Sequence, residues 1–140
     1  MKKVIHLISI LLFVGCMTDT KETIDIVITP GTYLSSITIN TSTLTIESNY
    51  TADKIYFTSA YINSELMEES KGSYNIENQK LIYNNNQYRD FAFDITGEWE
   101  SRYQLPDTII NITGNSFQLY MDADLELNLS GQWITFKAIE

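Results

Sequence analysis

Residues 37–46 (ITINTSTLTI) and residues 110–119 (INITGNSFQL) carry the same pattern at positions 73 residues apart. In both stretches apolar and polar residues alternate, a short polar segment interrupts them, and the alternation then resumes. Alternation with a period of two is typical of a β-strand with one buried face, and a short polar interruption favours a turn. The sequence therefore predicts one β-hairpin pattern that occurs twice.

The same alternation continues through most of residues 24–140, which we predict to form a single domain. Residues 63–72 (NSELMEESKG) are an exception and predict a loop with one helical turn. Residues 84–86 (NNN) predict a turn, and residues 88–103 predict one long strand that bends at Gly97. About ten strands with short connections are typical of an all-β antiparallel meander, closed into a barrel or folded as a β-sandwich.

A Gly-x-aromatic motif flanks each copy of the hairpin. Residues 31–33 (GTY) precede the first copy and residues 97–99 (GEW) precede the second, while residues 72–74 (GSY) and 131–133 (GQW) follow them. The pattern predicts two similar halves. If these halves close edge to edge, no strand edge is left exposed to aggregation.

The N-terminus has the features of a secretory signal. Lys2 and Lys3 precede a mostly apolar run over residues 4–14, and Gly15 follows as a small residue at the cleavage position. We therefore expect residues 1–15 to be a signal helix that is removed and residues 16–23 to be a flexible tether. A formal net charge of −9 for the whole chain then becomes −11 without Lys2 and Lys3. Such an acidic domain lacks the basic footprint of a nucleic-acid-binding protein.

The residues Phe13-Val14-Gly15-Cys16 resemble the lipobox of bacterial lipoproteins, with Phe13 in the place of the usual Leu. The resemblance implies that Cys16 is lipidated and anchors the protein in a membrane of the bacterial cell envelope. Several acyl chains give stable anchoring. Met17 in place of an Asp favours the outer membrane. A simple secretory signal is the alternative.

Catalytic and metal-binding groups are scarce in this sequence. The one histidine, His6, lies in the expected signal, and Cys16 is the one cysteine. Without a thiolate or imidazole cluster, the sequence predicts no metal site and no cofactor. Without a histidine base it predicts no conventional nucleophilic catalysis, so we expect a protein that is not an enzyme.

Large aromatic side chains are the remaining candidates for function. Their alternation predicts an inward-facing set that either lines a cavity for a small apolar ligand or fills the core: Phe57, Phe91, Phe93, Trp99, Phe117 and Phe136. An internal void above about 300 Å³ favours binding of a ligand. A filled core favours a structural or inhibitory module that binds another envelope protein.

The Gly97-x-Trp99 motif, which leads into a β-meander, resembles the lipocalin-like domains of small bacterial lipoproteins. The resemblance implies a β-barrel in which the glycine permits a close turn and the tryptophan plugs one end. It also implies a basic side chain over the ring, for which Arg102 is the candidate, and a non-catalytic binding function. The family carries this motif on its first strand, where this sequence has Gly31-x-Tyr33.

Overall fold

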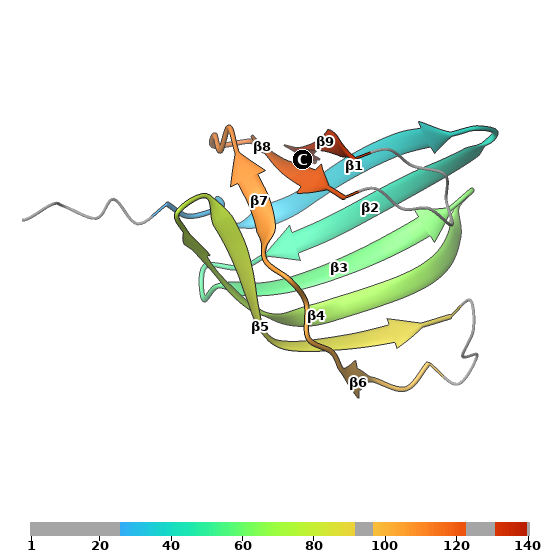
Figure 1. The fold of residues 1–140 in the computed structure, drawn as a ribbon, viewed down its shortest axis with the longest axis horizontal. Coiled ribbons are helices and arrows are strands. Elements are labelled where there is room, and N and C mark those ends of the chain that lie inside the picture. Colours follow the sequence, from blue (N-terminus) through green and yellow to red (C-terminus); the bar gives the residue numbers. More distant parts are fainter. Residues whose placement is uncertain (1–25, 92–96, 123–130, 140) are drawn as a thin grey trace, which may run out of the picture.

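A computed structural model describes residues 26–91, 97–122 and 131–139, and these residues form one antiparallel sheet (Figure 1). Eight strands close into a barrel, because β1 pairs with β9 and β4 pairs with β5. A ninth strand, β6, adds to β5. The described strands are β1 (Gly31–Ile39), β2 (Ser42–Tyr50), β3 (Ile55–Ile62), β4 (Glu65–Glu77), β5 (Lys80–Asp90), β6 (Glu100–Ser101), β7 (Asp107–Ile110), β8 (Ser116–Met121) and β9 (Gln132–Ala138).

Both predicted hairpins are present, and the all-β barrel is confirmed. In the first hairpin Ile37 pairs with Leu44, and Asn40 adopts the left-handed conformation (φ 53°) that a two-residue hairpin turn needs. In the second hairpin, formed by β7 and β8, Ile110 pairs with Gln118. A copy of the first hairpin 73 residues further on would pair Ile110 with Phe117, so the observed pairing differs by one residue. The two hairpins therefore share a topology but not a strand register.

The prediction of a loop with one helical turn over residues 63–72 was wrong, because residues 65–72 belong to the strand β4. Asn63 and Ser64 both have positive φ (51° and 71°) and form a tight turn, so Glu65 pairs at once with Ile62 of β3. The loop prediction gave weight to the charges of this segment and did not confine the turn to its first two residues, Asn63 and Ser64.

The predictions for residues 84–86 and 88–103 were wrong as well. β5 runs through residues 84–86 as a strand, and a register shift between Lys71 and Ser73 of β4 accommodates it. β5 then ends at Asp90, and β6 is a separate, two-residue strand.

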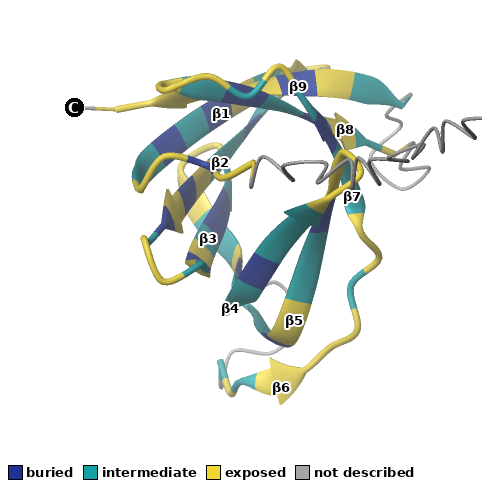
Figure 2. Ribbon diagram, turned by 90° about the vertical axis from the view of Figure 1, so that its left-hand side faces the viewer, coloured by how far each residue is buried: buried dark blue, intermediate teal, exposed yellow. Residues whose placement is uncertain are grey.

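Aromatic side chains fill one end of the barrel, which we call the closed end. The ring centroid of Tyr33 lies 5.0 Å from that of Phe117 and 6.0 Å from that of Tyr50, while Phe117 stacks on Phe136 at 5.0 Å. Tyr50 in turn meets Tyr74 edge to face at 5.1 Å. Figure 2 shows the strands arranged in a ring, with buried residues alternating with more exposed ones along them. This end is therefore a packed core.

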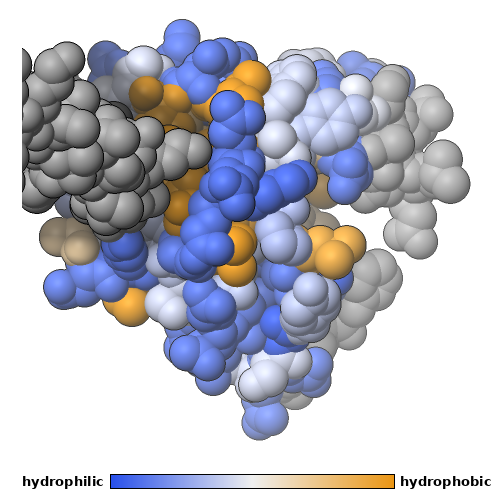
Figure 3. All heavy atoms as spheres, turned by 60° about the vertical axis from the view of Figure 1, so that its left-hand side comes forward, coloured by the Kyte–Doolittle hydropathy of each residue, from blue (hydrophilic) through white to orange (hydrophobic). Residues whose placement is uncertain are grey.

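The chain just before β1 covers the closed end. Ile28 is 2 % exposed, and the hydroxyl of Tyr33 donates a 2.8 Å hydrogen bond to the carbonyl of Thr29. Hydrophilic residues cover most of the outside in the view from this side, with hydrophobic residues in separate patches (Figure 3).

Replacing Phe117 by Ala should lower the free energy of unfolding by about 3–5 kcal/mol, because the residue is 1 % exposed among other rings. Phe57→Ala is the matched control, since Phe57 is 38 % exposed on the outer surface, and it should cost about 1 kcal/mol. Urea denaturation of both variants measures the difference. Equal losses of stability would contradict the assignment of the closed end as the core.

Candidate functional site

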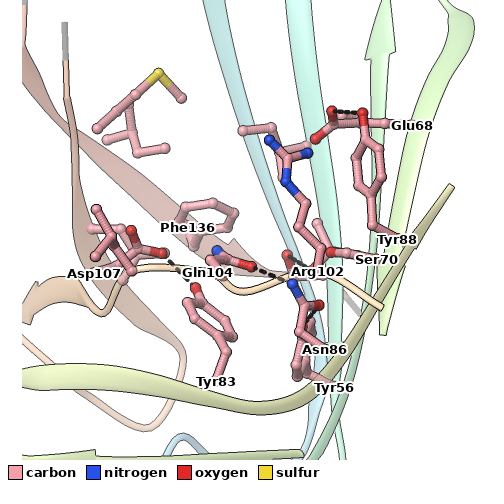
Figure 4. Close-up of a pocket in the computed structure, with 18 of the residues that line it drawn as sticks. Tyr56, Glu68, Ser70, Tyr83, Asn86, Tyr88, Arg102, Gln104, Asp107 and Phe136 are labelled. Atoms are coloured by element: carbon pink, nitrogen blue, oxygen red, sulfur yellow. Dashed lines mark hydrogen bonds between the residues drawn. The ribbon is translucent and has the colours of Figure 1, made fainter. Parts of the chain in front are cut away.

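The other end of the barrel, which we call the open end, contains a cavity of about 520 Å³. Its floor is formed by Tyr50 and Phe136, so the cavity begins where the closed end stops. Its two sides differ in chemistry. An apolar wall comes from β2, β3, β8 and β9: Ile46, Ala60, Leu119, Met121 and Ile134. A polar wall comes mainly from β4, β5 and the chain between β6 and β7: Glu68, Ser70, Tyr83, Asn86, Tyr88, Arg102, Gln104 and Asp107 (Figure 4).

The barrel wall beside this cavity is incomplete as a sheet. On the side away from β4, β5 pairs with β7 only at Lys80 and Leu81, and with β6 only at Gln87 and Tyr88. Between these two points residues 102–106, which we call the strap, run beside β5, held by a 3.0 Å bond from the backbone N–H of Arg102 to the carbonyl of Asn86. The strap places Tyr103 and Leu105 at the cavity, although these side chains are 83 % and 71 % exposed. The strap thus takes the place of a strand at one side of the cavity.

A chain of hydrogen bonds joins the barrel interior to the strap. The hydroxyl of Tyr56 donates to Oδ1 of Asn86, and Nδ2 of Asn86 donates to Oε1 of Gln104 at 3.2 Å. Asn86 is 7 % exposed, so these bonds satisfy a buried amide. Burial raises the pKa of Tyr56 to about 12, which keeps its hydroxyl protonated and able to donate at neutral pH.

Asp107, the first residue of β7, lies at the deep side of the polar wall. Its Oδ2 accepts a 2.5 Å hydrogen bond from the hydroxyl of Tyr83 (Figure 4). Burial raises the pKa of Asp107 above its ordinary value, with the bond from Tyr83 acting in the opposite direction. Burial also raises the pKa of Tyr83. Near neutral pH the pair is therefore a hydroxyl donor facing a largely desolvated carboxyl group.

A second acidic group, Glu68, lies on the far side of the cavity. The hydroxyl of Tyr88 is 3.2 Å from Oε2 of Glu68 and 2.9 Å from Oδ2 of Asp90. The guanidinium carbon of Arg102 lies 4.5 Å from the centroid of the Tyr88 ring. Burial raises the pKa of Glu68, whereas the hydroxyl of Tyr88 and the positive charge of Arg102 lower it. Glu68 therefore has a cationic neighbour within the lining of the cavity.

The predicted aromatic set is divided between the inside and the outside of the barrel. Phe117 and Phe136 lie in the core, and Phe136 also lines the cavity. Phe57 is exposed, which corrects the prediction that it faces inward, because the alternation along β3 points Tyr56 into the barrel instead. Phe91 is half-buried, and Phe93 lies outside the described residues.

Trp99 does not plug the barrel, which corrects the expectation from the family motif. Its ring packs against the outward-facing Phe57 at 6.4 Å, with Nζ of Lys71 3.9 Å and the guanidinium carbon of Arg89 4.6 Å from its centroid. The ring therefore does have basic neighbours, but Arg102 is not one of them. The residue in the position of the plug is Tyr33, two residues after Gly31 on β1.

A partly buried ion pair lies in the outer layer of side chains beside Trp99. Arg89 forms a salt bridge with Glu69, which is 8 % exposed and also accepts a 3.4 Å hydrogen bond from Oγ of Ser59. Gly97 has a left-handed φ of 60°, and a Cβ there would lie 2.9 Å from the Phe91 ring, so this turn requires glycine. These contacts fix the chain just before β6 against β3, β4 and β5, and so set where the strap begins.

Sequence reasoning missed the polar residues that line the cavity. Asn86 falls within residues 84–86, which the sequence predicts as a turn, and the sequence does not single out Tyr56, Tyr83 or Asp107 as site residues. Asn86 lies where the register between β4 and β5 shifts, and Gly72 at this shift is a weak sequence signal, since a Cβ there would lie 2.7 Å from the carbonyl oxygen of Asn84. Asp107 follows Pro106 at the start of a strand, and that position is the one signal that marked it as a residue at a strand end.

Other predictions fall outside the described residues. Cys16, the signal over residues 1–15 and the tether over residues 16–23 are among them. Within the residues that the structure describes, no helix is long and apolar enough to cross a membrane. Nor do three or more His, Cys, Asp or Glu side chains gather in this part of the chain as a metal site would require.

No model of a protein family matches the sequence, and no curated protein matches it.

Trp99→Ala should release the start of the strap while leaving the barrel closed. We expect the amide of Arg102, which bonds to Asn86, to exchange its hydrogen about tenfold faster. The amide of Ile109, which bonds to Gln79 across the β5–β7 junction, should be unchanged. Hydrogen exchange followed by NMR measures both amides.

Trp133→Ala is the matched control, because Trp133 packs on Tyr120 at 5.2 Å on the outer face of β8 and β9. It should leave the exchange of Arg102 unchanged. An unaltered Arg102 amide in Trp99→Ala would contradict the anchoring role of Trp99.

Proposed function

We propose that the protein is a non-catalytic binding protein that holds a small molecule with an apolar part in the open end of the barrel. The observation that carries this proposal is the cavity of about 520 Å³, which exceeds the size of about 300 Å³ typical of the smallest ligand pockets. A closed barrel with a filled interior would have no such space. The apolar wall supplies the driving force for uptake, since burial of apolar surface contributes about 25 cal/mol per Å².

The division of the cavity into two walls supports a ligand with a polar end. Donors and acceptors along β4, β5 and the strap would orient that end, while Ile46, Leu119 and Ile134 would contact the apolar body. The exposed strap residues Tyr103 and Leu105 lie at the cavity and offer a route of entry through the side of the barrel.

Filling the cavity tests this function. Ala60 is 8 % exposed and lines the cavity from β3, so Ala60→Phe should occupy space that the ligand needs. With the neutral dye Nile red as a probe, we expect saturable fluorescence enhancement by the parent protein and binding weaker by about tenfold or more in the variant. Thr38→Phe, on the exposed outer face of β1, is the control and should leave binding unchanged. Equal affinity of the parent and Ala60→Phe would exclude the cavity as the site.

The cellular location of the protein is a separate proposal. We propose that lipidation of Cys16 anchors the domain in a membrane of the bacterial cell envelope, favouring the outer membrane. The lipobox-like residues 13–16 and the polar tether after them support it. Cys16→Ala should move the protein from the membrane fraction to the soluble fraction, as immunoblotting of fractionated cells would detect. Continued membrane association of the variant would overturn this proposal.

A second candidate function is a module that binds another envelope protein. Tyr120 and Trp133 favour it, because they form an edge-to-face pair on the outer face and are 37 % and 43 % exposed. Aromatic side chains of this kind are common in protein interfaces. Capture of a partner that is lost in Trp133→Ala, with no small molecule bound in the cavity, would support this second function over the first.

A further inference from the structure

We infer that the ligand carries a positively charged head group, an amine or a quaternary ammonium, that binds beside Asp107 among the rings of Tyr50, Tyr56 and Tyr83. This inference rests on the proposed binding function and adds the chemical class of the ligand. A ligand of this class differs from the fatty acids and neutral lipids that a purely apolar cavity would bind.

The first observation is the aromatic surround of Asp107. Asp107, Tyr50, Tyr56 and Tyr83 all line the cavity, and the rings of Tyr56 and Tyr83 meet edge to face at 5.1 Å. Burial raises the pKa of each of these three tyrosines, and the negative charge of Asp107 raises it further, so all three lie within the field of the carboxylate. Rings of neutral tyrosine beside a carboxylate form the kind of surround that attracts an organic cation.

The second observation is the distribution of charge around the cavity. Among the described residues that line it, Arg102 is the one cationic side chain, and it lies over Tyr88 on the side of Glu68. The positive charge of Lys80 acts on Asp107, but its Nζ donates a 2.5 Å hydrogen bond to Oγ1 of Thr108, and Lys80 is exposed. On the Asp107 side of the cavity, the side-chain partner of the carboxylate among the described residues is thus a hydroxyl, that of Tyr83.

Charge also argues against an anionic ligand. A carboxylate head near Asp107 would meet a like charge in a desolvated site, and near Arg102 it would meet Glu68. The formal net charge of −9 would slow the approach of anions and favour the approach of cations. A bare metal ion is a poor fit, because one carboxylate among tyrosine rings offers too few oxygen ligands.

Three probes with the same alkyl chain test the inference on the purified protein: decyltrimethylammonium, decanol and decanoate. Isothermal titration calorimetry below the micelle-forming concentrations should show decyltrimethylammonium binding about tenfold or more tightly than either of the others. Asp107→Asn keeps an acceptor for Tyr83 and should abolish this preference without altering the affinity for decanol. Glu65→Gln removes the same charge from an exposed position and should leave the preference intact.

The outcomes separate the inference from the proposed function. Binding of decanol or decanoate as tightly as the ammonium probe would overturn the inference and leave the binding function standing. The same preference for the ammonium probe in Asp107→Asn would overturn the assignment to Asp107. Binding of none of the three probes would overturn both the inference and the proposed function.

Discussion

Closure of the sheet is the constraint on which the other features depend. Once β1 pairs with β9 and β4 pairs with β5, every second side chain must point into a ring of eight strands. At the closed end that space is filled by Tyr33, Tyr50 and Phe117, with Ile28 covering them. At the open end the inward positions carry smaller or polar residues such as Ser48, Ala60 and Ser70, and a cavity remains. The cavity is thus a consequence of which residue sizes occupy the inward positions.

The strap, which is not a regular strand, contributes polar side chains to the cavity. β7 is short, so on the side away from β4 the middle of β5 has no paired strand among the described residues, and the strap lies there instead. A strap exposes side chains and backbone groups that a sheet would pair, which is how Gln104 and Arg102 reach the cavity. Trp99 takes part from the outside, because its contacts with Lys71 and Arg89 fix the chain that leads into the strap. The Gly-x-Trp motif therefore supports the site without belonging to it.

The sequence predicted the architecture well and the site poorly, for physical reasons. Alternation identifies strands, and it predicted the barrel and the hairpin turn at Asn40. It cannot say which parity faces inward, so of the four Gly-x-aromatic motifs Tyr33 and Tyr74 lie in the core whereas Trp99 and Trp133 lie on the outside. A register shift such as the one between β4 and β5 leaves only a weak signal, here the glycine at position 72. Asn86 lies at that shift, and for that reason it was not predicted as a site residue.

The central claim is that the open end of the barrel holds a ligand inside, between an apolar and a polar wall. Intermolecular nuclear Overhauser effects from bound decyltrimethylammonium measure this most directly. The claim predicts contacts from the alkyl chain to the methyl groups of Ile46, Leu119 and Ile134, and from the ammonium methyls to the rings of Tyr56 and Tyr83. Contacts confined to outward-facing residues such as Ile55 and Val27, with none to the cavity, would contradict it.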